Sequence, residues 1–305
     1  MRRFLPLFLL LVPVVAMAGE AAVKTITASS TQKADVGVNY EPENMLEPTG
    51  FVYWAEGDGS AGLGTRIDVK FASTLELTGF ALWNGSQSDA ETFKNSNRVK
   101  TMEFEFKAGT FGDAIKETVE LKDNKERTVY TFKEHRKADQ LKMYIREVFN
   151  GEAFNETAIS HIKFLTAGGE SLVYATGVTS SSEADGYPAS AVIDGLVDTP
   201  WCVKEGKGKG ESIEITLPEG TKLQRISGFF GVNIESEWDK NARPKAVKVE
   251  IGDKKLDWAL EDTRDEQKLE LGGVEATTLK ITLGAVMKGR AYKDACVSEI
   301  RFETE

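Results

Sequence analysis

The chain has 305 residues, with 48 acidic and 38 basic side chains and a formal net charge of −10 at neutral pH. A negative surface of this kind disfavours nucleic acid or anionic lipid as a partner. The length accommodates two domains of common size, and the two cysteines allow one disulfide.

The first 18 residues have the pattern of a secretory signal peptide. Two arginines precede an apolar run over residues 4–15, and Ala16-Met17-Ala18 fits the small-x-small rule for cleavage. The run is interrupted by two prolines and is shorter than the about 20 residues that a membrane-spanning helix needs. We therefore expect an exported chain, periplasmic or secreted, that starts at Gly19 and has no membrane span. An uncleaved membrane anchor is the alternative.

From there on, the apolar residues follow the pattern of β-strands. Apolar and polar positions alternate, as a strand with one buried face requires, and Gly, Asn and Asp cluster in between. The clearest alternating segments are residues 66–71, 101–106, 212–217, 246–251 and 278–283. No segment has a helical period over three turns. The pattern predicts an all-β chain built of antiparallel sandwiches, and a jelly roll fits the strand count.

The chain also repeats itself. Residues 138–164 align without gaps to residues 276–302, and the correspondence continues upstream at a different offset. There, residues 78–85 match 227–234, residues 98–106 match 243–251, and Trp54 falls on Trp201. The sequence thus predicts two copies of one domain, residues 19–167 and 174–305. The linker between them is short, so the copies should lie close together.

The second copy carries a family resemblance, on DGLVDTPW (194–201), GKGKGESIEITL (206–217), ISGFFGVN (226–233), NARPKAVKVEI (241–251) and KDACVSEIRF (293–302). These segments resemble the coagulation-factor type C, or discoidin-like, superfamily. Within it they are similar to the NAD glycohydrolase translocation branch, also called the NADase-type glycan-binding domain. The resemblance covers nearly all of the mature chain and is degraded in the first copy. It implies two tandem galactose-binding-like jelly-roll β-sandwiches that recognise carbohydrate.

The resemblance further implies a structural calcium ion in the second copy. In discoidin-like carbohydrate modules, a D-G-x-x-x-T-x-W pattern supplies an Asp, a Thr and loop carbonyls, and a Glu near the last strand closes the cage. These ligands fall on Asp194, Thr199 and Glu299, with carbonyls near Ala191 and Leu196. Oxygens of these kinds are what calcium prefers. The alternative is that Asp194-Gly195 is only a turn and Glu299 only an edge charge.

Two further points of this alignment stay open. Asp198 either helps to bind the ion or faces solvent. In the first copy Glu299 is matched by His161, which is expected to be an ordinary polar residue at a strand edge, and Thr199 is matched by Val52. A calcium site is therefore not expected in the first copy.

The same cage would make neighbours of the two cysteines, Cys202 and Cys296. Their partners in the first copy are Ala55 and Ala158, both small. This predicts a Cys202–Cys296 disulfide, and two separately buried thiols are the alternative. By chain entropy, the bond would stabilise the domain by about 4 kcal/mol.

Candidate sugar contacts lie in one long loop of each copy, because a sugar ring stacks on an exposed aromatic face and its hydroxyls need polar partners. The second copy offers Asn233, Glu235, Trp238, Asn241, Arg243 and, from the turn before the last strand, Tyr292. The first copy offers Trp83, Asn84, Phe93, Asn97 and Arg98. The alternatives are that the two arginines form structural ion pairs and that Tyr292 packs on its own turn. Trp54 and Trp201 are expected to be core or rim anchors.

The sequence therefore favours an exported, non-catalytic protein that binds a glycan or cell-surface polysaccharide. The alternative is a periplasmic protein-interaction or structural module with an envelope protein as partner. An uncharacterised hydrolase remains as a third hypothesis, because fold alone does not fix function. The glycine-rich segments 57–64 and 205–211 lack the ending of a phosphate loop, and we interpret them as flexible connections between strands.

Overall fold

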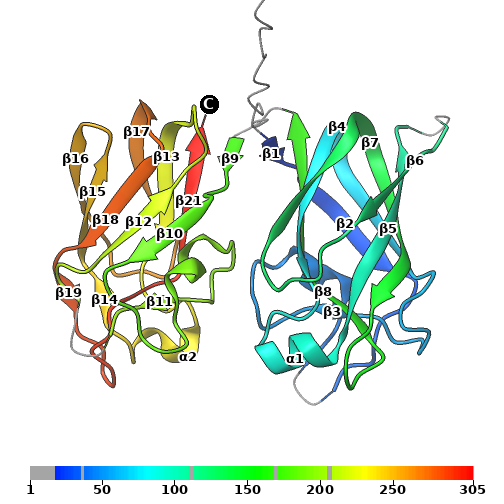
Figure 1. Ribbon diagram of the computed structural model, residues 1–305, viewed down its shortest axis with the longest axis horizontal. Coiled ribbons are helices and arrows are strands. Elements are labelled where there is room, and N and C mark those ends of the chain that lie inside the picture. The colour runs from blue at the N-terminus through cyan, green and yellow to red at the C-terminus, as the bar shows by residue number, and fades with distance from the viewer. Residues whose placement is uncertain (1–17, 36–37, 110–112, 168–170, 205–207, 305) are drawn as a thin grey trace, which may run out of the picture.

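The computed structural model describes residues 18–35, 38–109, 113–167, 171–204 and 208–304. The predicted signal peptide lies outside these residues except for Ala18. The described chain forms two β-sandwiches that lie side by side (Figure 1).

The first sandwich is built around two long strands. Its strands are β1 (Ala18–Glu20), β2 (Val23–Ala28), β3 (Trp54–Ala55), β4 (Arg66–Asn84), β5 (Asn97–Lys107), β6 (Ile115–Glu120), β7 (Thr128–Phe149) and β8 (Thr157–Ala167). A 3₁₀ turn, η1 (Pro42–Leu46), and a short helix, α1 (Ala90–Asn95), lie between them. Strand β4 pairs with β2, β7 and β8. Because its register shifts twice, β4 contributes to both faces of the sandwich.

The second sandwich has two separate sheets. Its elements are β9 (Ser171–Val173), β10 (Gly177–Ser180), η2 (Ala189–Ile193), β11 (Trp201–Cys202), β12 (Ser212–Thr216), β13 (Lys222–Phe229), α2 (Glu235–Trp238), β14 (Arg243–Pro244), β15 (Ala246–Ile251), β16 (Lys254–Ala259), β17 (Gln267–Glu275), β18 (Thr278–Leu283), β19 (Val286–Met287), β20 (Cys296–Val297) and β21 (Glu299–Thr304). One sheet has the order β10-β12-β18-β15-β16, and the other contains β17-β13-β21. Figure 1 shows α1 and α2 at the same end of the molecule.

Each sandwich encloses its own apolar core. The alternating segments form strands as predicted, and their apolar positions point inward; in β5, for example, Phe104 and Phe106 are buried. Trp54 and Trp201 are completely buried, and their indole N–H groups donate to the carbonyls of Ser30 and Ser182. The predicted fold, two tandem galactose-binding-like jelly rolls, is confirmed. No helix among the described residues is long and apolar enough to cross a membrane.

One β-sheet continues from domain 1 into domain 2. Strand β9 pairs with β1 on one side and with β21 on the other, and so joins the domains. Further along, the amide of Val197 donates to the carbonyl of Pro48 over 2.8 Å. The Asp198 carboxylate accepts from the amide of Gly50 at 2.9 Å. Asp198 thus does not face solvent, and its carboxylate fastens the second domain to a loop of the first.

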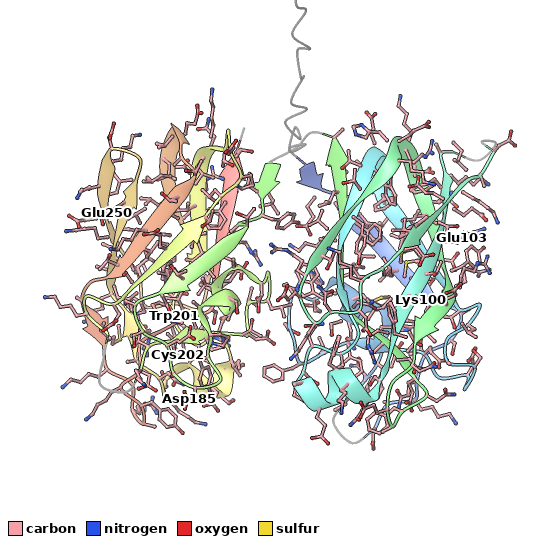
Figure 2. The ribbon with its side chains drawn as sticks, viewed as in Figure 1. Lys100, Glu103, Asp185, Trp201, Cys202 and Glu250 are labelled. Atoms are coloured by element: carbon pink, nitrogen blue, oxygen red, sulfur yellow. A yellow bond between two sulfur atoms is a disulfide. The ribbon has the colours of Figure 1, made fainter. Side chains whose placement is uncertain are left out.

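The predicted disulfide is present. Cys202 of β11 pairs directly with Cys296 of β20, with 4.1 Å between their Cα atoms. In domain 1, Ala55 of β3 pairs with Ala158 of β8 in the same register. Trp201 and Cys202 lie in the half of domain 2 that also carries the Asp185 turn (Figure 2). The alanine and cysteine pairs are therefore structurally equivalent, as the alignment of the two copies requires.

Candidate functional site

A buried arginine organises the loop end of domain 2. Arg243, in β14, is 7% exposed and forms a bidentate ion pair with Asp262, with Nε–Oδ1 and Nη2–Oδ2 distances of 2.5 and 3.0 Å. The pair lowers the pKa of Asp262, chiefly through the hydrogen bond from Arg243. This corrects the prediction that Arg243 contacts a ligand: its Nε and Nη2 are committed to the Asp262 carboxylate, and its Nη1 donates to the carbonyl of Trp238 at 3.4 Å. The ion pair that the sequence left open is the one formed.

Arg243 holds Trp238 in place. Its guanidinium carbon lies 4.8 Å from the centre of the Trp238 ring, a cation–π distance. The indole also lies so close to Gly231 that a Cβ there would come within 2.5 Å of it. Trp238 is half-buried. One part of a large aromatic ring is thus clamped while another part remains accessible.

Tyr292 lies in a turn that docks on the end of α2. The amides of Ala291 and Tyr292 donate to the carbonyl of Lys240 at 3.0 and 2.8 Å. The Tyr292 side chain is 52% exposed. Its backbone is therefore fixed while its ring is presented to solvent next to the α2 segment.

The remaining predicted contacts of domain 2 surround this segment. Glu235 is the most exposed, with 91% of its side chain accessible and a distant ion pair to Arg264 at 3.8 Å. The Asn241 amide donates to the Glu237 carbonyl at 3.1 Å, and Asn233 is half-buried. Sequence reasoning missed Tyr187, which is 46% exposed; its carbonyl accepts from the amide of Cys202. An exposed tyrosine in a loop without apolar alternation is a weak signal in sequence.

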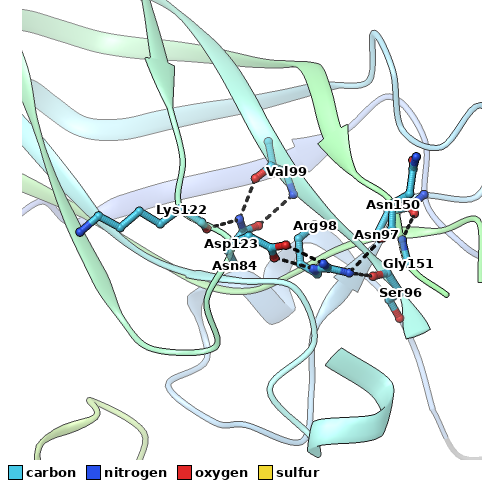
Figure 3. A network of polar contacts seen from close by, with 9 residues as sticks. All are labelled: Asn84, Ser96, Asn97, Arg98, Val99, Lys122, Asp123, Asn150 and Gly151. Atoms are coloured by element: carbon cyan, nitrogen blue, oxygen red, sulfur yellow. Dashed lines mark hydrogen bonds and ion pairs between the residues drawn. The ribbon is translucent and has the colours of Figure 1, made fainter. Parts of the chain in front are cut away.

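Domain 1 has an equivalent arginine–aspartate pair beside an aromatic ring, but its predicted polar contacts are buried. Arg98 forms a bidentate pair with Asp123 at 2.9 and 2.8 Å, and its guanidinium carbon lies 5.2 Å from the centre of the Phe93 ring. Figure 3 shows Arg98 between Asp123 and the carbonyls of Ser96 and Asn150. Arg98 is 8% exposed. It is therefore a supporting residue too, which corrects its prediction as a ligand contact.

The two predicted asparagines of domain 1 are also internal. Asn84 is 3% exposed and bonds both the amide and the carbonyl of Val99, as Figure 3 shows. Asn97 bridges the Gly151 amide and the Asn155 carbonyl. Neither side chain is available to a sugar, because the strands and loops of the domain use its polar atoms.

Trp83 is a contact between the domains rather than a sugar platform. It is 1% exposed, and its indole N–H donates to the carbonyl of Asp194 at 2.8 Å. It packs with Leu196 and Tyr174 of domain 2 in a small apolar cluster. The prediction that Trp83 binds ligand is corrected, because domain 2 covers its ring.

The predicted calcium ligands converge at this same boundary. The Asp194 carboxylate accepts from the Leu196 amide and the Thr199 hydroxyl, both at 2.8 Å. The Glu299 carboxylate accepts from the Gly195 amide at 3.1 Å. The carbonyls of Ala191 and Leu196 face the same loop, since they accept from the Asp194 amide and the Thr199 hydroxyl. The structure thus brings together all five predicted ligands.

The two carboxyl groups are poorly solvated. Burial raises the pKa of Asp194 to about 7, although some of its surface remains accessible. Burial, and then the nearby Asp194 charge, raise the pKa of Glu299 well above its usual value. Two neighbouring carboxylates that lose water favour a bound proton or a bound cation.

A cationic side chain from domain 1 reaches this site, which sequence reasoning did not foresee. Arg127 donates to the carbonyl of Ile193 at 2.9 Å, and its guanidinium carbon lies 4.2 Å from the centre of the Tyr174 ring. Burial lowers the pKa of Arg127, while Asp194 and Glu299 oppose that shift. Arg127 therefore lies near both acids, and the structure shows no direct ion pair between it and Asp194 or Glu299.

This donor set fits calcium in chemistry. It offers two carboxylates, a hydroxyl and backbone carbonyls, which are hard oxygen ligands. Among the described residues, no group of three or more His, Cys, Asp or Glu side chains forms a metal cluster. Carbonyl and hydroxyl oxygens would therefore have to complete the shell.

The corresponding position of domain 1 is chemically different. His161 is buried in the middle of β8, not at a strand edge as predicted; its Nδ1 lies 2.8 Å from the Met45 carbonyl and its ring centre 4.6 Å from that of Trp83. Burial lowers the pKa of His161 to about 3, so it is neutral. An apolar packing arrangement thus occupies the place of the carboxylate cage.

Two discoidin-like sandwiches in tandem, with Trp238 held at the α2 end of the second, are the architecture of a tandem F5/8 type C module. A family model described as the NAD glycohydrolase translocation F5/8 type C domain matches residues 18–165 and 167–303. The chain belongs to this family. No curated protein matches it.

Several solved structures are similar to the chain at low identity. The CBM32-1 and CBM32-2 domains of Clostridium perfringens ZmpB in complex with GalNAc are 11% identical, with a TM-score of 0.38 and coverage of 93% of this chain and 90% of that one. An allantoicase is 13% identical, with a TM-score of 0.44 and coverage of 95% and 92%. A family 32 module of C. perfringens NanJ in complex with galactose is 16% identical, with a TM-score of 0.34 and coverage of 42% and 93%. The chain spans 38% of a ZmpB structure that also contains the M60 catalytic domain.

Proposed function

We propose that the protein is an exported, non-catalytic binding protein whose second domain recognises a glycan at its α2 end. The observation that carries this proposal is the Trp238 ring, held by Arg243 and Gly231 and only partly buried. A rigid aromatic face loses little conformational entropy when a sugar ring stacks on it.

Polar and aromatic neighbours support the same location. Tyr292 offers a second exposed ring, and Glu235 an exposed carboxylate. Asn233 and Asn241 add amide groups at the two ends of α2. In domain 1 the equivalent polar groups are internal, so we assign the ligand to domain 2. Domain 1 then serves to hold domain 2 in place through the contacts between the domains.

A calcium ion at Asp194, Thr199 and Glu299 forms part of this proposal. When bound, it would neutralise two buried carboxylates and tie the 194–199 loop to the start of β21. The ion is structural, because it lies at the domain boundary rather than at the α2 end. Ala191 and Leu196 would contribute their carbonyls.

A glycan array with the full chain tests the proposal. We expect binding to a subset of glycans that falls at least tenfold for Trp238→Ala and severalfold for Tyr292→Ala. The matched control is Phe93→Ala, which removes the equivalent ring of domain 1 and should leave binding unchanged. Each array is run with calcium and again with a chelator. Binding that survives Trp238→Ala would reject this site.

A protein partner in the cell envelope is the second candidate, and one observation favours it. Leu63 and Phe154 are 51% and 50% exposed on neighbouring loops of domain 1. These loops touch, because Asn155 donates to the carbonyl of Gly59 at 2.8 Å. Co-purification of one partner that is lost in Leu63→Ser/Phe154→Ser, together with a blank glycan array, would favour this candidate.

A further inference from the structure

The loop between β3 and β4, residues 56–64, contains a buried acid with an unused oxygen. Glu56 is 0% exposed. Its Oε2 accepts from the Asp58 amide at 3.0 Å, whereas its Oε1 has no hydrogen-bond partner. A buried carboxylate oxygen without a partner is costly unless a proton or a cation compensates it.

The loop is folded back over this side chain and held there. The Thr157 hydroxyl donates to the carbonyl of Ala61 at 2.6 Å, and Asn155 to that of Gly59 at 2.8 Å. A Cβ at Gly62 would stand 3.2 Å from Cγ of Glu56. The glycine-rich segment is therefore an ordered cover over Glu56, not the flexible connection that its composition suggested.

The charges around Glu56 are negative. Burial raises its pKa to about 7, followed by a side-chain hydrogen bond with Asp58, and Glu156 adds to the shift. A hydrogen bond between two carboxyl groups requires a proton between them. A divalent cation can take the place of that proton, and it neutralises both carboxylate charges where the proton neutralises one.

The spacing of oxygen donors suits a cation. Glu56, Asp58 and Ser60 alternate along the loop, as side-chain ligands of calcium loops do, and the loop amides of Asp58 and Ser60 donate to the carboxylates of Glu56 and Asp58. The loop curls at Ala61, whose φ of 58° is left-handed. Asp58 and Ser60 are exposed, so the position is reachable from solvent while Glu56 lies beneath it.

We propose that residues 56–64 of domain 1 form a second divalent-cation site, with calcium as the fitting ion, bound by Glu56, Asp58, Ser60 and carbonyls of the loop. It is separate from the Asp194 and Glu299 cage of domain 2 and does not depend on glycan binding. Because only two carboxylates belong to the loop itself, its dissociation constant should be weak, on the order of 10⁻⁴ M, as in extracellular calcium modules. The ion holds in place the cover that packs against residues 155–157.

Calcium titration of the full chain by calorimetry tests this inference, with terbium luminescence excited through tryptophan as a second readout. The titration is done in an Asp194→Asn/Glu299→Gln background, which removes both carboxylate charges of the domain 2 cage. We expect this background to bind one calcium ion. Adding Asp58→Asn should weaken that binding at least tenfold, and Glu56→Gln should do the same.

The matched control is Asp113→Asn, which removes an exposed acid elsewhere in domain 1 and should leave the affinity unchanged. Asp58 is exposed, so its variant should fold, and circular dichroism verifies this. Failure of the background protein to bind calcium at millimolar concentration would overturn the proposal and leave a shared proton between the two carboxyl groups. Binding that is unaffected by Asp58→Asn would overturn it equally.

Discussion

The two domains share an arginine–aspartate ion pair beside an aromatic ring, and they differ in the residues around it. Each has a buried arginine that grips an aspartate and stacks on an aromatic ring: Arg98, Asp123 and Phe93 in domain 1, and Arg243, Asp262 and Trp238 in domain 2. In domain 2 this ring is the partly buried indole of Trp238. In domain 1 the neighbouring polar side chains, Asn84 and Asn97, form hydrogen bonds to the backbone inside the domain.

The domains differ most where the carboxylate cage would be. Domain 2 has two facing carboxyl groups there, while domain 1 has a neutral His161 against Trp83. Trp83 then reaches across and bonds the cage loop of its neighbour. The difference teaches that the same position holds a pair of buried carboxyl groups in one copy and a buried contact with the neighbouring domain in the other. The following experiments test that division, from the largest expected effect to the smallest.

The disulfide is the largest stability difference between the copies. Cys202→Ala/Cys296→Ala recreates the alanine pair of domain 1 and should lower the unfolding free energy by about 4 kcal/mol, because the unfolded chain regains loop entropy. Scanning calorimetry measures the change. In the opposite direction, Ala55→Cys/Ala158→Cys should form a bond in the same strand register and stabilise domain 1. A loss below about 1 kcal/mol in domain 2 would contradict the entropic argument.

Replacing the buried arginine should destabilise either domain, but it should reduce glycan binding only in domain 2. Arg243→Met loses charged hydrogen bonds to Asp262 and the clamp on Trp238, and should destabilise by about 2 kcal/mol. Arg98→Met should cost a similar amount through Asp123. Denaturant unfolding measures both, and a glycan array should report lost binding only for the Arg243 variant. Equal effects on binding would contradict the assignment of the ligand to domain 2.

The two domains should respond to pH with opposite signs. The pKa of Asp194 is raised to about 7 in the fold, so the folded state holds more protons, and stability without calcium should fall as pH rises from about 4 through 7. The slope is at most about 1.4 kcal/mol per pH unit for one proton. Calcium should therefore raise the melting temperature at pH 8 more than at pH 5. Asp194→Asn should flatten this dependence.

In domain 1, His161 should make the fold sensitive to acid. Its pKa is lowered from 6.5 to about 3, so the unfolded state binds the proton first, and stability falls as pH drops below about 6.5. Melting curves between pH 7 and pH 4 measure this. His135→Gln, which alters the exposed histidine, is the control and should leave the slope unchanged. An unchanged slope in His161→Gln would contradict the assignment.

The smallest expected effect is at the contact between the domains. Asp198→Asn weakens the bond to the Gly50 amide by removing its charge, and should cost about 1 kcal/mol. Small-angle scattering should show a slightly more extended molecule. Asp185→Asn, on the Asp185 turn, is the control. An unchanged profile and stability would mean that β9 alone fixes the arrangement.

Much of this could be predicted from the chain, because repeats and alternation are local patterns. Strands such as β5 and β15 alternate residue by residue, and Cys202 and Cys296 fall opposite Ala55 and Ala158 when the copies are aligned. The cage ligands followed the resemblance. What failed were those predicted ligand contacts that the fold uses internally, because side chains such as Arg243 and Asn84 look available in sequence when their partners are far away along the chain.

The sequence by itself determined the two sandwiches, the disulfide and the set of oxygen donors, since each is written in residue type and spacing. Only the tertiary structure decided which side chains face solvent. Asp262 lies 19 positions from Arg243, and Asp194 lies 111 positions from Trp83. Burial depends on such distant partners, and no local pattern contains them. The same reason explains why residues 57–64 were predicted to be a flexible connection, whereas contacts with distant Asn155 and Thr157 hold them in place.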